Sequence, residues 1–167
     1  ANEGTVDGLV VTGNSATVGS DMIYSANDVS GLVQIVGDVT NVTVEDNDLN
    51  WLATDEDISG VTPASAYKAT LEGVSLNGGI NGTVTVAGND IDFATDELQE
   101  IGIYIAETRG GAAGTYSATT TIANTNNVDF AGGADTQYDV IFDGMAGDKH
   151  VTIEELPLDS VTFADII

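Results

Sequence analysis

Short segments with strand character recur along the whole chain, and turn-forming residues separate them. Segments that alternate apolar residues with threonine, as strands with one buried face do, are 42–44, 83–86 and 151–153. Longer runs, which we interpret as buried strands, are 8–11, 32–36, 101–105, 116–122 and 138–142. The sequence therefore predicts a domain built mainly from short β-strands.

The residues between these segments favour tight turns. Asn77-Gly78-Gly79 and Asn81-Gly82 supply residues that tolerate a positive φ, which short hairpin turns require. Gly110-Gly111 and Gly132-Gly133 have the same character. We therefore expect consecutive strands to pair as antiparallel hairpins.

Only two segments have helical character. Residues 63–71 favour a short helix with Thr62 as N-cap and Pro63 at the first helical position, but alternation within the same segment predicts a strand equally well. Residues 95–100 favour a single helical turn, because Asp96 and Glu97 suit a helix N-terminus. The expected fold is all-β: an antiparallel β-sandwich or jelly-roll-like barrel with zero to two short helices.

Two parts of the chain resemble each other. Residues 42–61 align with residues 84–103 at an offset of 42 up to Trp51 and 41 after it, and residues 120–141 form a weaker third copy. Each copy predicts a strand, an Asn/Asp turn and a second strand with one aromatic residue. Duplication and chance similarity within a Thr/Val/Asn-rich sequence both explain the match. In either case we expect the hairpin to be the building block of a single domain, 1–167. Repeats of about 40 residues also occur in propeller blades, but few copies without blade signatures favour a sandwich.

The charge balance is extreme. Twenty-seven Asp and Glu residues stand against three Lys and Arg residues, for a formal net charge of -24 in 167 residues. On a folded surface of roughly 7,700 Å², the excess charges lie roughly 18 Å apart. Their repulsion is felt at ~0.1 M salt, where the Debye length is ~10 Å, and is nearly screened in molar salt. A 42% hydrophobic content argues against disorder, so a folded protein of a hypersaline medium is predicted.

Several function classes are disfavoured by composition. Nucleic-acid binding needs clusters of Lys and Arg, and no apolar stretch is long enough for membrane insertion. With no cysteine and a single histidine, His150, the usual nucleophiles and bases are scarce. Paired carboxylates serve glycoside hydrolysis, but usually in a cleft richer in aromatic residues. We predict no enzyme, no catalytic residue and no cofactor.

One segment has the spacing of a calcium loop. Asp46-x-Asp48-x-Asn50 matches its first ligands, but Trp51 replaces the required glycine and Asp57 replaces the twelfth-position glutamate, so an EF-hand is excluded. Looser binding of Ca, Mg, Na or K ions at acidic turns is the alternative to plain solvated carboxylates, and we assign no fixed metal ligand. The residues considered for such loose binding are Asp46, Asp48, Asp90, Asp92 and Asp96.

Aromatic side chains are expected to anchor the core, since each falls in a strand-like segment. They are Trp51, Phe93, Phe130, Phe142 and Phe163. The apolar tail, residues 156–167, is expected either to pair into the sheet of its own chain or to dock onto the sheet edge of a neighbouring subunit. We favour docking, with residues 1–7 as a complementary exchanged arm.

A strand-rich, cysteine-free, acidic chain of this kind resembles, in composition over its whole length, structural proteins of haloarchaeal viruses and of haloarchaeal cell surfaces. The resemblance carries no motif and transfers no residue roles. It implies a non-enzymatic subunit in the virion or on the extracellular surface, which self-assembles and contacts other structural proteins. A capsid, decoration or tail component is favoured, since the chain as given shows no leader, anchor or Thr-rich stalk. A pilus, surface-layer or adhesin domain is the alternative, and a polysaccharide-binding β-domain is the third.

Overall fold

A computed structural model describes residues 6–19, 29–52, 70–94, 99–106, 116–131, 136–143, 151–153 and 161–164. Every regular element within these ranges is a strand. In chain order the strands are β1 (Val6–Thr12), β2 (Ser15–Val18), β3 (Val29–Val36), β4 (Val39–Glu45), β5 (Asp48–Trp51), β6 (Thr70–Asn77), β7 (Ile80–Ala87), β8 (Asp90–Phe93), β9 (Gln99–Ala106), β10 (Thr119–Ile122), β11 (Asn127–Phe130), β12 (Thr136–Asp143), β13 (Val151–Ile153) and β14 (Val161–Ala164).

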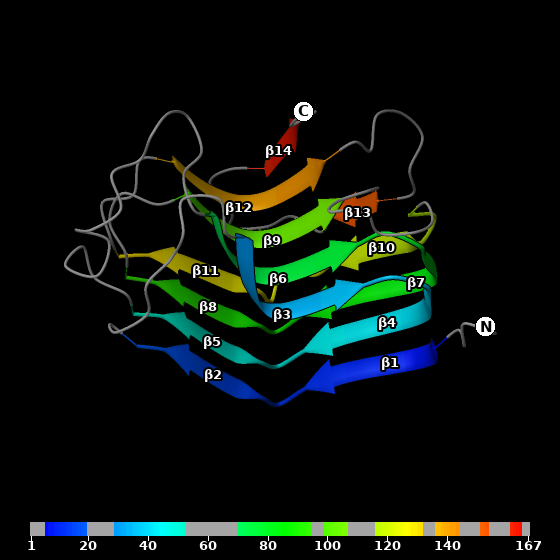
Figure 1. Cartoon of the computed structure of the whole chain (residues 1–167), viewed down its shortest axis with the longest axis horizontal. Coiled ribbons are helices and arrows are strands. Elements are labelled where there is room, and N and C mark those ends of the chain that lie inside the picture. Colours follow the sequence, from blue (N-terminus) through cyan, green and yellow to red (C-terminus); the bar gives the residue numbers. More distant parts are fainter. Residues whose placement is uncertain are drawn as a thin grey trace.

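These strands form three sheets in which every neighbouring pair is parallel. Sheet A has the order β1-β4-β7-β10-β13, sheet B the order β11-β8-β5-β2, and sheet C the order β14-β12-β9-β6-β3. The chain passes from sheet A to B to C and then starts the next turn (Figure 1). This arrangement is a parallel β-helix.

The all-β content agrees with the sequence, but the antiparallel sandwich or jelly-roll-like barrel is wrong. The expected hairpins are absent from the described residues because consecutive strands, such as β4 and β5, belong to different sheets. Each strand pairs instead with its counterpart one turn later. The two segments that resemble each other therefore lie side by side, with Val42 opposite Val84 and Trp51 opposite Phe93.

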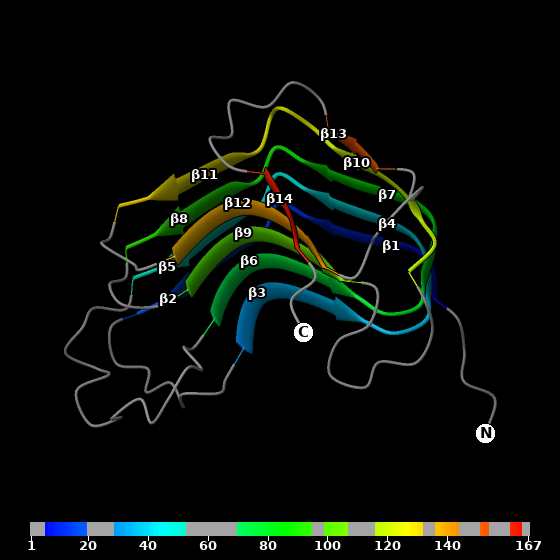
Figure 2. The same cartoon turned by 90° about the horizontal axis from the view of Figure 1, so that it is seen from above.

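Viewed along the stack, sheets A and B form one layer that bends where they meet, and sheet C lies along the inner side of that bend (Figure 2). At the first three corners between sheets A and B, the bend is made by one residue with a positive φ followed by an asparagine. The positive-φ residues are Gly13 (65°), Asp46 (54°) and Gly88 (64°). A single left-handed residue redirects the chain into a new sheet without folding it back on itself.

The residues expected in hairpin turns do not form hairpins in the structure. Gly78 has a positive φ of 86° and lies between β6 and β7, which belong to different sheets. Gly82 lies inside β7, opposite a register irregularity next to Asn41 of β4, and both residues have a positive φ. Asn-Gly pairs therefore mark a corner and a bulge here.

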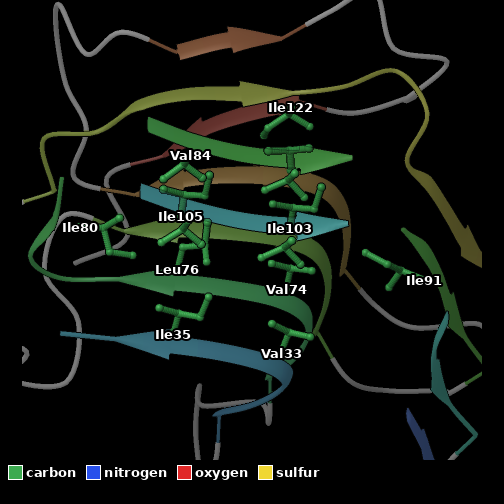
Figure 3. Packing of buried hydrophobic residues seen from close by; sticks show 14 of the residues in the cluster. Val33, Ile35, Val74, Leu76, Ile80, Val84, Ile91, Ile103, Ile105 and Ile122 are labelled. Carbon is green, nitrogen blue, oxygen red and sulfur yellow. The ribbon is translucent and has the colours of Figure 1, made fainter. Parts of the chain in front are cut away.

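The core lies between the layers. Side chains of equivalent positions stack along the helix axis, as in the columns Val33–Val74–Ile103 and Ile35–Leu76–Ile105 of sheet C (Figure 3). Facing them are Val84 and Ile122 of sheet A, which are 1% and 0% exposed. Burial of each such side chain stabilises the fold by about 1.5–3 kcal/mol.

The alternating segments and the longer runs of the sequence lie in different sheets. Strands β6 and β9 of sheet C are buried along almost their whole length, whereas β4 of sheet A alternates buried and partly exposed residues. Residues 8–11 are an exception, because β1 is an edge strand and Val10 is 57% exposed. Likewise, only Thr119–Ile122 of the run 116–122 forms a strand.

The structure contains no helix within its described ranges. Residues 62–69 and 95–98, where the helices were expected, lie outside those ranges. The residues at the ends of both segments are in strands, since Thr70 begins β6 and Gln99 begins β9. The strand alternative for residues 63–71 is therefore correct at Thr70 and Leu71.

Candidate functional site: the outer face of sheet B

The outer face of sheet B carries two columns of polar side chains, one residue per turn. The strand registers place the members of each column side by side. The first column is Ser15, Asp48, Asp90 and Asn127, and the second is Thr17, Asn50, Asp92 and Asp129. Neighbours in a column are ~4.8 Å apart, and the columns are separated by ~6.6 Å, the spacing of alternate residues in a strand. The result is a regular grid of oxygen and amide groups.

Strand alternation explains why these side chains face outward. In β5 the polar residues Asp48 and Asn50 alternate with Leu49 and Trp51, which are 0% and 2% exposed. The inward column continues from Trp51 through Phe93 to the partly buried Phe130. The rings of Phe93 and Phe130 stack with centroids 5.3 Å apart and planes 16° apart. Large apolar side chains thus hold every second residue of the sheet outward.

A ladder of asparagines fixes the bend beside this face. Asn14, Asn47, Asn89 and Asn126 follow the corner on successive turns. The Nδ2 atoms of Asn14, Asn47 and Asn89 donate to the Oδ1 atom of the next asparagine at 3.0, 2.8 and 2.9 Å. Nδ2 atoms also donate across turns to the carbonyls of Val11, Val44 and Val86. Buried amides that are satisfied in this way lock the register of sheet A against sheet B.

Carboxylates accumulate at the centre of the grid. The pKa of Asp92 is raised from its ordinary value, first by partial burial and then by the charges of Asp90, Asp129 and Asp48. Two charges 4 Å apart repel by about 1 kcal/mol in bulk water, and more near a protein surface. The face therefore stores repulsion that dissolved cations can screen.

Amide and hydroxyl groups offset part of this repulsion. Asn50 donates its Nδ2 to Asp48 Oδ1 at 2.5 Å, and Asn127 donates to Asp90 Oδ1 at 2.8 Å. Ser15 donates its hydroxyl to the other Asp48 oxygen at 3.4 Å. The face can thus hydrogen-bond to a hydroxylated molecule and attract hydrated cations.

The structure brings together three of the five residues considered for loose cation binding. Asp48, Asp90 and Asp92 share the face, Asp46 occupies the adjoining corner, and Asp96 lies outside the described residues. No group of three or more Asp, Glu, His or Cys residues in the described part of the chain has the geometry to hold a metal ion. The binding of Ca, Mg, Na or K ions stays a prediction, and the binding that we predict is diffuse.

Sequence reasoning missed Asp129 and the asparagine ladder. Asp129 falls in the weak third copy, and its alignment with Asp92 was the available signal. Buried carboxylates in sheet C were also missed. Glu100 is 0% exposed and accepts a hydrogen bond from Gln137 Nε2 at 3.0 Å, and Asp139 is 5% exposed. No local motif marks a carboxylate that becomes buried in a β-helix.

Several other sequence predictions concern residues outside the described ranges. Lys68, Arg109, Lys149 and His150 all lie there, so no cationic side chain is present in the part of the chain described. Residues 1–5 of the proposed arm and residues 156–160 and 165–167 of the tail also lie outside. The favoured docking of the tail is wrong for Val161–Ala164, because these residues form β14 and pair with β12 of the same chain. Of the aromatic anchors, Trp51, Phe93 and Phe142 are buried, while the side chain of Phe163 is not described.

Among the residues that the structure describes, no helix has the length and apolar character needed to cross a bilayer. Comparisons of the chain with protein-family models, with curated proteins and with solved structures gave no match.

Proposed function

We propose that this chain is a non-enzymatic structural subunit of an extracellular assembly that works in concentrated salt, as a component of a virion. The observation that carries this proposal is the carboxylate grid of sheet B, stacked in register on a rigid parallel β-helix. A surface of this kind is adapted to a medium that screens charge.

The architecture supports a mechanical role. Each turn is joined to the next by strand pairing in three sheets, by the asparagine ladder and by the stacked core. In such a stack each turn contacts only its neighbours along one axis, and this extended geometry suits a shell, tail or fibre component.

In this proposal, salt screens the charge repulsion that opposes folding and assembly. The net charge of -24 opposes both folding and the approach of a second subunit. At molar ionic strength the Debye length falls to ~3 Å, which is less than the ~4.8 Å between neighbours in the grid. Assembly then proceeds through short-range contacts.

A haloarchaeal cell-surface role, as a pilus, surface-layer or adhesin domain, follows from the same features. The grid itself favours a second function, the binding of a polysaccharide. Its carboxylate, amide and hydroxyl groups repeat regularly along the axis, as the hydroxyl groups of a linear glycan do. Such a contact depends on hydrogen bonds and would be lost if Asp90 and Asn50 were replaced by alanine.

Electron microscopy of the purified protein in molar KCl tests the proposal, with a sample dialysed to low salt as the control. Shells, tubes, fibres or sheets that form only in high salt support a structural subunit. Particles that stay dispersed at every concentration, together with specific binding to a glycan array, would assign the polysaccharide-binding role instead.

A further inference from the structure

Among the residues that the structure describes, nothing covers the end of the β-helix formed by the first turn. Strands β1, β2 and β3 are each the outermost strand of their sheet, so one edge of each pairs with no other strand among the described residues. Figure 1 shows β1 and β2 at the lower end of the stack. Unpaired strand edges of this kind are templates for pairing with another strand.

The first turn also exposes part of its core. Leu9 and Val11 are only partly buried, whereas their neighbours one turn later, Val42 and Val44, are 2% and 0% exposed. The same holds in sheet B, where Ala16 and Val18 are only partly buried beside Leu49 and Trp51 of the next turn. These side chains line the end of the molecule, where the next turn of a β-helix would cover them.

The asparagine ladder is incomplete at the same end. The Oδ1 atoms of Asn47, Asn89 and Asn126 each accept a backbone N–H and a side-chain amide from the preceding turn. Asn14 has no preceding turn within the described residues, and its Oδ1 accepts no hydrogen bond from them. Within the described residues, this end therefore combines three features: a hydrogen-bond acceptor that is not used, Asn14 Oδ1, partly buried apolar side chains, and unpaired strand edges.

This end carries little charge for so acidic a protein. Asp7 is the only charged residue in 6–19 and 29–36. Counted over equal lengths, residues 1–36 carry four acidic and no basic residues (net -4), whereas 132–167 carry eight acidic residues and one lysine (net -7). Interface cores are depleted of charge. Two first-turn ends therefore repel each other less than a first-turn end and a last-turn end.

The surface described above is present on every copy of the chain. A matching strand edge with matching apolar side chains is available on a second copy of the same chain.

We propose that the first-turn end binds the same end of a second copy, with the two β1 strands pairing antiparallel across a twofold axis. Such a contact is closed, because the same surface is used by both partners. Strand pairing supplies the hydrogen bonds, and Leu9, Val11, Ala16 and Val18 supply apolar contact. The inference rests on the proposed function and names one contact between subunits of the assembly.

Sedimentation equilibrium of the full chain in molar KCl provides the first test, with Ala16→Asp and Ala131→Asp as a matched pair. Ala16 lies at the open end, and Ala131 is exposed after β11 at the far edge of sheet B. We expect a dimer whose dissociation constant rises by roughly tenfold or more with Ala16→Asp, because two like charges then face each other, and is unchanged with Ala131→Asp. A monomer at all concentrations, or equal effects of both variants, would overturn the proposal.

A distance measurement keeps the test valid if Ala16→Asp disturbs folding. The chain has no cysteine, so Ser15→Cys and Asn127→Cys each give a single site for a spin label. These residues share one column, three strands apart. The proposal predicts a longer distance between labels at Asn127 than at Ser15, by up to roughly 30 Å, or twice three strand spacings of ~4.8 Å.

The remaining outcomes are distinguishable. A shorter distance at Asn127 than at Ser15 means that the last-turn ends meet, which contradicts the proposed contact. Equal distances mean head-to-tail packing and contradict it as well. In either case, assembly that depends on salt in electron microscopy would leave the proposed function standing.

Discussion

The side-chain amide of Asn47 donates a hydrogen bond of 2.8 Å to the Oδ1 atom of Asn89, a residue 42 positions further along the chain. The same number is the offset at which the two similar segments of the sequence align. The similarity in sequence thus corresponds to a physical contact between neighbouring turns. A residue at this position serves two turns at once, so its loss affects both.

Replacement of Asn89 by alanine is expected to lower the free energy of unfolding by about 2–4 kcal/mol. Asn89 is 1% exposed, and its side chain bonds to Asn47, Val44, Ala87 and Asn126. Its removal leaves buried donors and acceptors unsatisfied. The measurement is urea unfolding in molar KCl, because guanidinium chloride would itself change the ionic strength.

Asn127→Ala provides the matched control for this change. Asn127 is exposed and bonds to Asp90 on the surface, so its loss should change stability by no more than about 0.5 kcal/mol. Equal effects of the two substitutions would show that the ladder does not hold the turns together.

Replacement of Gly73 by alanine tests how closely the turns pack. An added Cβ would lie 2.5 Å from Ile91 Cγ2 and 2.7 Å from the backbone oxygen of Gly102. The backbone cannot yield easily, so a loss of about 1–3 kcal/mol is expected. At Gly19 an added Cβ meets nothing within 4 Å, so Gly19→Ala should be neutral or slightly stabilising. A neutral Gly73→Ala variant would contradict the close approach of β6 to sheet B.

Asp92 should make the fold less stable as the pH rises. Its pKa in the folded state is raised, so the folded state holds the proton more tightly than the unfolded chain does. This contribution is complete below the unfolded pKa of about 4 and is lost as the pH rises through the folded pKa. At neutral pH, Asp92→Asn should therefore increase the free energy of unfolding, with the gain largest at low salt.

Asp38→Asn is a suitable control for Asp92→Asn, since it removes one charge from an exposed turn away from the grid. Urea unfolding of both variants at neutral pH, in low salt and in molar KCl, gives the comparison. If Asp38→Asn stabilises the protein as much as Asp92→Asn does, net charge alone governs stability, and the grid has no special effect.

The sequence was sufficient to predict strand content and many of the strand positions. The alternating segments lie in sheet A, and the apolar runs 32–36, 101–105 and 138–142 lie in sheet C. Alternation and burial are local properties, so they can be recognised from neighbouring residues. The pairing partner of a strand is not local, and here it lies 21 to 42 residues away.

The antiparallel prediction failed at the corners. Asp46-Asn47 and Asn77-Gly78 have the composition of hairpin turns, because both structures need a residue with positive φ. Composition does not determine whether the chain reverses or enters a new sheet. The aligned repeat was the feature that could have decided this, since parallel stacking brings equal residues of successive copies together, as Trp51 and Phe93 show. Asp48, Asp90 and Asp92 could be selected from sequence, but their shared face could not.

The most direct test of this account is the free energy of unfolding, measured with urea, as the KCl concentration rises from ~0.1 M to the molar range, where screening is nearly complete. Crowded carboxylates on a stacked β-helix predict a steep increase in stability with salt, and assembly only at the high end. A free energy of unfolding that stays constant over this range would contradict both the role of salt and the structural function proposed from it.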